Sequence, residues 1–223
     1  MKNRTHGPAM LVLAAVLLAA MSTDSSAQEA DPASKWALIL DIGSLSPSGS
    51  GLSSEAGSVT SDLEFDTGVG AGFRLEYRFT DLLGAEFAVF SAARLDLESS
   101  VLPGSVESRA RLGSITPVTA GLNVHLMRGR APDLYVGVQL GVVRYGSIEV
   151  RATTGGETER ISGDAEFAWG VSLGLGFPIG KHGWSLQGSL RYLDAGIKHS
   201  GTGPEVHGDV SPTIVTVGVG YAF

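Results

Sequence analysis

The sequence predicts an all-β fold: an eight-stranded antiparallel transmembrane β-barrel of the outer-membrane type. Three observations predict it. Eight segments alternate between apolar and small or polar residues, long and short connections alternate between them, and the last segment ends on an aromatic residue. In that segment the odd positions from Val215 to Phe223 are all apolar and share one face. A terminal strand with an apolar face is prone to aggregate in water, whereas lipid accommodates it.

Each of the eight segments has the period-2 alternation of a strand and is bounded by turn residues. The predicted strands are residues 35–45, 65–79, 82–97, 111–126, 134–146, 164–177, 184–198 and 213–223.

The first four strands carry their apolar residues on one face. These are the even positions of 36–42, the odd positions of 69–79, the odd positions of 83–89 and the even positions of 118–126. The alternation is unbroken over 69–79. Glycine and charged residues occupy most of the opposite faces, which therefore point to a different environment.

The last four strands repeat the pattern. Their apolar positions are the even positions of 134–142, the odd positions of 167–177, the even positions of 184–192 apart from Gly188, and the odd positions of 215–223. These strands are about ten residues or longer, the length that a tilted strand needs to cross a bilayer. A soluble β-sandwich is the alternative, but its strands are usually about 5–6 residues long.

The connections alternate in length. Residues 80–81, 128–133 and 180–183 are short, whereas 46–64, 98–110, 149–163 and 199–210 are long, polar and rich in Gly and Ser. Outer-membrane barrels have short periplasmic turns and long extracellular loops. The pattern therefore places both ends of the barrel domain on the periplasmic side.

The N-terminal segment predicts export. Lys2 and Arg4 precede an apolar run from Ala9 to Ala20, and small residues follow up to Ala27. This is the pattern of a signal peptide, residues 1–27, that leaves a barrel domain of residues 28–223 in the bacterial outer membrane. The alternative, a membrane-anchoring helix, needs about 20 apolar residues.

Composition narrows the function. The chain has no cysteine and a formal net charge of −7. The absence of cysteine excludes disulfides and thiol chemistry. The negative net charge argues against a nucleic-acid partner, whose phosphates require a basic surface.

With the apolar faces outward, the opposite faces carry polar side chains into the barrel. The predicted lumen-facing residues are Asp41, Arg74, Glu76, Arg78, Glu86, Asn123, His125, Gln139, Glu166, Gln187 and Arg191. An eight-stranded barrel is just wide enough for side chains to fill, so charges inside it must be paired or hydrated. One hypothesis is a plug in which arginines 74, 78 and 191 pair with Asp41, Glu76, Glu86 and Glu166. The other is that some of these groups line a small ligand path.

Catalytic, cofactor and metal sites are not expected. His199 and Ser200 are adjacent at the end of the seventh strand; neighbouring residues on a strand point to opposite faces, so the two cannot easily pair as base and nucleophile. The histidines lack metal-ligand spacing. The glycines of residues 68–72 lie inside a predicted strand with no helix after it, which argues against a phosphate loop.

Aromatic residues gather at the predicted periplasmic end. They are Trp36, Tyr77, Phe79, Phe177, Trp184, Tyr221 and Phe223, and they are typical of an interfacial girdle. We also expect Tyr221 and Phe223 to form the signal that the barrel-assembly machinery reads.

Several segments, in order, resemble the OmpW family of small outer-membrane barrels. They are Ile115-Thr116-Pro117 before the fourth strand, Leu134-Tyr135-Val136-Gly137-Val138, Ala168-Trp169-Gly170-Val171, Arg191-Tyr192-Leu193-Asp194, and Val210-Ser211-Pro212 leading to Gly218-Val219-Gly220-Tyr221-Ala222-Phe223. Arg191 stands where the family has tryptophan. The resemblance implies an eight-stranded barrel that binds or passes small hydrophobic solutes, with outer-membrane lipid and lipopolysaccharide around it. The alternative is a structural or surface-interaction barrel of the OmpA or OmpX type with a plugged lumen.

Overall fold

The computed structural model describes residues 35–48, 53–54, 63–65, 67–99, 108–126, 132–152, 158–161, 164–180, 182–199, 206–209 and 211–223. Within these ranges all regular secondary structure is β-strand. No helix among the described residues has the length and hydropathy needed to span a membrane. The predicted signal peptide, residues 1–27, lies outside the described residues.

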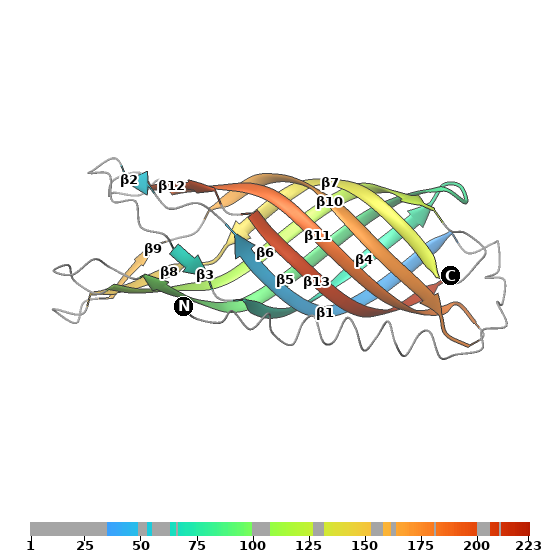
Figure 1. Cartoon of the computed structure of the whole chain (residues 1–223), viewed down its shortest axis with the longest axis horizontal. Helices are drawn as coiled ribbons and strands as arrows, with labels where there is room; N and C mark the ends of the chain where they lie inside the picture. Colours follow the sequence, from blue (N-terminus) through green and yellow to red (C-terminus); the bar gives the residue numbers. More distant parts are fainter. Residues whose placement is uncertain are drawn as a thin grey trace, which may run out of the picture.

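Eight long strands form the wall of a closed barrel (Figure 1). They are β1 (Trp36–Ser48), β4 (Gly68–Arg78), β5 (Leu83–Ser99), β6 (Ser108–His125), β7 (Asp133–Tyr145), β10 (Ala165–Pro178), β11 (Trp184–His199) and β13 (Ser211–Ala222). Each pairs antiparallel with the next, in the order β1, β4, β5, β6, β7, β10, β11, β13. The predicted eight-stranded antiparallel barrel is confirmed, and the strand bounds lie within about three residues of those expected from alternation.

Closure is made by β1 and β13, whose register runs from Ala37 opposite Ala222 to Ser48 opposite Ser211. At the end of this seam, Phe223 N donates to Trp36 O at 2.9 Å and Trp36 N donates to Phe223 O at 3.2 Å. A closed sheet leaves no unpaired edge, which lipid requires because it offers backbone groups no hydrogen bonds.

Short strands lie where the sequence predicted long loops. They are β2 (Ser53–Ser54), β3 (Leu63–Phe65), β8 (Ile148–Ala152), β9 (Thr158–Ile161) and β12 (Val206–Asp209). β3 pairs with β5, β8 with both β6 and β9, and β12 with β11 and β2, so they extend the wall at one end (left in Figure 1). We call this the loop end and the opposite one, with the short turns, the turn end. These segments lack a long alternating pattern, so the sequence gives little signal for them.

The outer surface is apolar. Large apolar side chains at the outward positions are strongly exposed, for example Leu40 (63%), Ile42 (69%), Val69 (74%), Val138 (62%) and Phe167 (64%). The residues between them on each strand are mostly buried, and many are charged. A water-soluble fold has the opposite distribution, so lipid is the solvent that this surface fits.

Aromatic residues gather at the turn end on one side of the barrel, on or next to the consecutive strands β11, β13, β1 and β4. The ring centroids of Trp36 and Tyr77 are 4.7 Å apart, those of Tyr77 and Phe79 are 5.2 Å apart, and those of Trp184 and Tyr221 are 4.9 Å apart. Side chains of this kind prefer the boundary between lipid tails and headgroups.

Candidate functional site: the barrel lumen

The interior of the barrel has two chemically different halves. The half toward the turn end is polar and charged, whereas the half toward the loop end is apolar. The apolar cluster consists of Leu45, Phe90, Ala92, Ile115, Val143, Tyr145, Ala168, Leu193, Ala195 and Ile214, each at most 4% exposed. Sequence reasoning singled out only the polar inward residues and missed this cluster. The signal was available, because Leu45 shares the face of Asp41, and Leu193 shares the face of Arg191.

Arg74 on β4 is the centre of the polar half and is 2% exposed. Its Nε donates to Asp41 Oδ2 at 2.6 Å and its Nη2 donates to Asp41 Oδ1 at 3.0 Å, so the pair is bidentate. Its Nη1 donates to the hydroxyl oxygen of Tyr135 at 2.5 Å. A single guanidinium thereby joins β1, β4 and β7.

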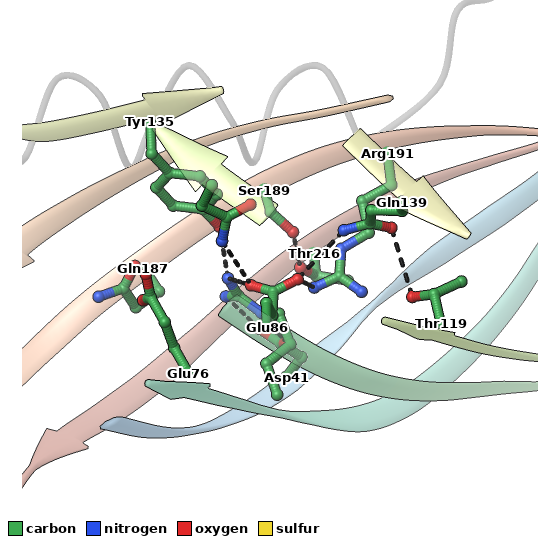
Figure 2. Close-up of polar contacts among 12 residues, drawn as sticks. Asp41, Glu76, Glu86, Thr119, Tyr135, Gln139, Gln187, Ser189, Arg191 and Thr216 are labelled. Atoms are coloured by element: carbon green, nitrogen blue, oxygen red, sulfur yellow. Dashed lines mark hydrogen bonds and ion pairs between the residues drawn. The ribbon is translucent and has the colours of Figure 1, made fainter. Parts of the chain in front are cut away.

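Glu86 on β5 collects donors from several strands. Its Oε1 accepts from Arg191 Nη2 and from Gln139 Nε2, each at 3.1 Å, and its Oε2 accepts from Asn123 Nδ2 at 3.4 Å. Arg74 Nη1 lies 3.6 Å from the same Oε2. Figure 2 shows Glu86, Gln139 and Arg191 pointing toward one another inside the barrel.

The Glu86–Arg191 ion pair crosses the full width of the lumen. In the closed ring of eight strands, β5 and β11 are four strands apart in either direction, so they lie on opposite sides of the barrel. The two side chains are 2% and 6% exposed. A salt bridge between opposite walls must therefore pass through the barrel axis.

A second charged cluster lies nearer the turn end. His125 Nε2 is 2.6 Å from Glu76 Oε1, and its Nδ1 is 3.0 Å from Asp133 Oδ1. Arg78 Nη2 donates to Asp133 Oδ2 at 2.7 Å, and Arg78 Nε lies 3.9 Å from Glu76 Oε1. Both ring nitrogens of His125 thus face carboxylates, an arrangement in which an imidazolium donates on both sides.

The eleven residues predicted to face the lumen have different environments. Eight are buried: Asp41, Arg74, Glu76, Glu86, Asn123, His125, Gln139 and Arg191. Arg78, Glu166 and Gln187 are half-buried, and Gln187 Nε2 donates to Ser185 Oγ at 3.0 Å.

The predicted pairing needs two corrections. Glu166 lies opposite Val143, toward the loop end, and forms no ion pair within the described part of the chain. The closest carboxylate partner of Arg78 is instead Asp133, which the sequence placed in a short connection. Both differences arise from the stagger between strands, because alternation defines the face of a residue but not its depth in the barrel.

Other polar residues of the lumen were missed. Tyr135, Ser172, Ser189, Thr119 and Thr216 are buried on inward positions. Thr119 Oγ1 donates to Gln139 Oε1 at 3.3 Å, and the hydroxyl oxygens of Ser189 and Thr216 are 2.7 Å apart. Their inward positions could have identified them, but small hydroxyl residues and a tyrosine do not stand out as charges do.

The ion-paired groups of the lumen are equal in number of each sign when His125 is protonated, and they offer little reactive chemistry. Four carboxylates, those of Asp41, Glu76, Glu86 and Asp133, face three guanidiniums and one imidazole, those of Arg74, Arg78, Arg191 and His125. Within the described ranges, no group of three or more His, Asp or Glu side chains is arranged to hold a metal ion. Such a set of mutually bonded groups, six of them buried, can fill a cross-section and exclude solvent.

The closed wall, the apolar exterior and the charged interior define a class, the small outer-membrane β-barrels. The chain belongs to the outer membrane protein beta-barrel domain family, whose model matches residues 12–223. Membership of this family places the protein in the bacterial outer membrane.

Solved structures share the fold. OprG from Pseudomonas aeruginosa is 15% identical, with a TM-score of 0.64 over 87% of this chain and 98% of OprG. AlkL, solved in DMPC bilayers, is 20% identical, with a TM-score of 0.60 over 91% of this chain and 97% of AlkL. Outer membrane protein W of E. coli is 15% identical, with a TM-score of 0.51 over 87% of this chain and all of that chain. At these identities the likeness concerns the fold alone.

A curated relative matches part of the chain. A protein of Mesorhizobium japonicum named glycogen synthase is 30% identical over 122 residues, which is 50% of this chain and 25% of that protein. The chain thus matches about a quarter of the length of this relative.

Proposed function

We propose that the protein is an outer-membrane barrel closed to axial passage, and that it acts as a membrane-anchored scaffold for the segments at its loop end. The observation that supports this is the Glu86–Arg191 ion pair across the lumen. Arg74 adds bonds to Asp41 and Tyr135 beside it. Breaking one partner of such a buried pair costs about 3–5 kcal/mol. An ion passing along the axis would have to disrupt these contacts.

Conductance in planar bilayers tests this proposal. The wild-type protein is expected to stay at the baseline. The double variant Glu86→Ala with Arg191→Ala removes both charges, so neither remains buried and unpaired, and it is expected to hydrate the lumen and produce ion-conducting steps.

An outward variant, Leu40→Ala, is the matched control and is expected to stay at the baseline, because Leu40 faces lipid. Steady conductance of the wild type would contradict the proposal. So would a folded double variant that remains silent.

A second candidate function is the binding of small hydrophobic solutes, as in the OmpW family that the sequence motifs resemble. The apolar loop-end half of the lumen favours it, since apolar surface is what such a solute requires. In this proposal the solute occupies the apolar loop-end half of the lumen, and the ion pairs close the turn-end half.

Equilibrium binding of a neutral fluorescent aromatic probe tests the second candidate. Ile115→Asn places an amide in the apolar cluster and is expected to weaken binding about tenfold or more, because the amide must be desolvated there. Val219→Ala, on the outward face, is the control and should bind as the wild type does. Equal binding by the wild type and Ile115→Asn would exclude this site.

The proposed partners follow from the same architecture. Outer-membrane lipid, including lipopolysaccharide, would surround the apolar exterior, with the loop end extracellular and the turn end periplasmic. The barrel-assembly machinery would recognise Tyr221 and Phe223, which lie at the end of the closing strand.

A further inference from the structure

Polar residues interrupt the outward apolar runs of three adjacent strands near the loop end. On β5, β6 and β7 the outward residues Val89, Val118 and Val142 are followed toward the loop end by Ser91, Thr116 and Arg144, and on β5 one more small apolar residue, Ala93, follows on the outward face. We call Ser91, Thr116 and Arg144 the rim triad. Polar and charged side chains on the outward face fit the level of the lipid headgroups better than that of the lipid tails.

The three residues of the rim triad are neighbours. Ser91 Oγ and Thr116 Oγ1 are 3.0 Å apart. Thr116 lies directly opposite Arg144 in the β6–β7 register. The triad therefore forms a row across three adjacent strands, with two hydroxyls beside one guanidinium.

Arg144 is unusual among the charges of the barrel. Of the charged residues in the eight long strands whose side chains the structure describes, only Arg144 and Asp194 lie at outward positions. Arg144 is exposed and, within the described part of the chain, has no carboxylate within ion-pair distance. The other arginines with described side chains, at 74, 78 and 191, all have one. A cation on the lipid side is costly unless the membrane supplies its counter-charge.

We propose that the rim triad binds a phosphate group of the lipid A moiety of lipopolysaccharide. A guanidinium presents parallel N–H donors that match phosphate geometry, and the hydroxyls of Ser91 and Thr116 add donors beside it. Below the triad, Val118 and Val142 offer apolar surface for acyl chains. The proposal rests on the extracellular orientation of the loop end, because lipid A lies in the outer leaflet.

Native mass spectrometry of the detergent-solubilised full chain with added bisphosphorylated lipid A tests the proposal. Arg144→Gln is expected to lower the fraction of protein with bound lipid as though affinity had fallen about tenfold, the equivalent of one charge-assisted hydrogen bond. Arg144→Lys keeps the charge but loses the planar guanidinium. Its fraction of lipid-bound protein should lie between those of the wild type and Arg144→Gln.

The matched control is Lys35→Gln, which removes one exposed positive charge beside β1 at the turn end. It should bind lipid A as the wild type does. If Arg144→Gln and Lys35→Gln lose lipid A binding equally, the attraction is non-specific and the proposed site is overturned. A heat-modifiable band on a gel verifies that each variant is folded.

Three further ligands identify the source of the phosphate. Dephosphorylated lipid A should bind the wild type more weakly than bisphosphorylated lipid A does. It should bind the wild type and Arg144→Gln equally. If it binds the wild type as tightly as the bisphosphorylated form, the phosphate is not recognised and the proposal fails. Phosphatidylglycerol binding as tightly as lipid A, or inorganic phosphate displacing lipid A at millimolar concentration, would assign the triad to another phosphate source. The closed-lumen proposal is unaffected by any of these outcomes, because conductance measures it independently.

Discussion

Tyr135 and Gly174 illustrate how single residues build the lumen. They are directly opposite each other on β7 and β10, and the tyrosine ring occupies the space where a Cβ on residue 174 would lie. The ring thus covers the glycine while its hydroxyl oxygen accepts a hydrogen bond from Arg74. An aromatic residue covering a glycine on the next strand is a recognised device for stabilising curved sheets. Here it also fixes the position of the central guanidinium.

Gly174→Ala is therefore expected to destabilise the barrel. The added methyl group displaces the Tyr135 ring and weakens its bond to Arg74, at a cost of about 1–3 kcal/mol. The urea midpoint of unfolding in lipid vesicles, followed by tryptophan fluorescence, measures this.

Gly188→Ala on β11 is the matched control, because a Cβ there meets only Thr216 O at 4.0 Å. Its midpoint should equal that of the wild type. If the two alanine variants have the same midpoint, the contact of Tyr135 with Gly174 contributes nothing to stability.

At the scale of elements, β13 is the strand that closes the barrel. It pairs with β11 on one side and with β1 on the other, and only the second pairing closes the ring. Its last contacts are the two hydrogen bonds between Phe223 and Trp36. The Phe223 ring stacks near Tyr221, with centroids 6.2 Å apart, and is 57% exposed. Phe223 thus contributes to the seam through its backbone and to the outer surface through its side chain.

Deleting Phe223 is expected to slow insertion into vesicles and lower the folded fraction, which the heat-modifiable band on a gel measures. The deletion removes both seam hydrogen bonds, each worth about 0.5–1.5 kcal/mol, together with the aromatic side chain. Phe223→Ala keeps the backbone bonds and removes the ring alone.

The deletion and Phe223→Ala together separate the effect of the seam hydrogen bonds from that of the aromatic ring. If the barrel-assembly machinery reads the ring, Phe223→Ala should be impaired only when that machinery is present in the vesicles. Phe79→Ala, which removes an exposed aromatic from another strand, is the control. Insertion of the deletion variant at the wild-type rate, with or without the machinery, would contradict both roles.

At the scale of the whole molecule, the fold could be predicted almost completely from the sequence. The environment changes from lipid to lumen at every residue, so period-2 alternation carries a strong signal in all eight long strands. β8 and β9 were missed because they lie beyond the apolar exterior and their residues do not alternate over a long stretch. The sequence of Ile148–Ala152 therefore resembles that of a loop.

The lumen could be predicted only in part. Alternation identified Asp41, Arg74 and Glu86 as facing inward, and all three are buried. It could not identify partners, because Glu86 and Arg191 are 105 residues apart and meet only when the stagger around the whole ring brings them to one depth. The same reasoning placed Glu166 in the network and omitted Asp133. Depth is a property of the closed ring, not of any one strand.

The Glu86–Arg191 contact also has a mechanical consequence. A thin tube under lateral pressure from its surroundings deforms first by flattening, with one diameter shortening while the perpendicular one lengthens. A bond fixed to opposite walls resists lengthening along its own direction, and the packed side chains around it resist shortening. Glu86 and Arg191 thus resist flattening of the barrel cross-section. The same two residues that occupy the axis of the barrel therefore also stiffen its wall.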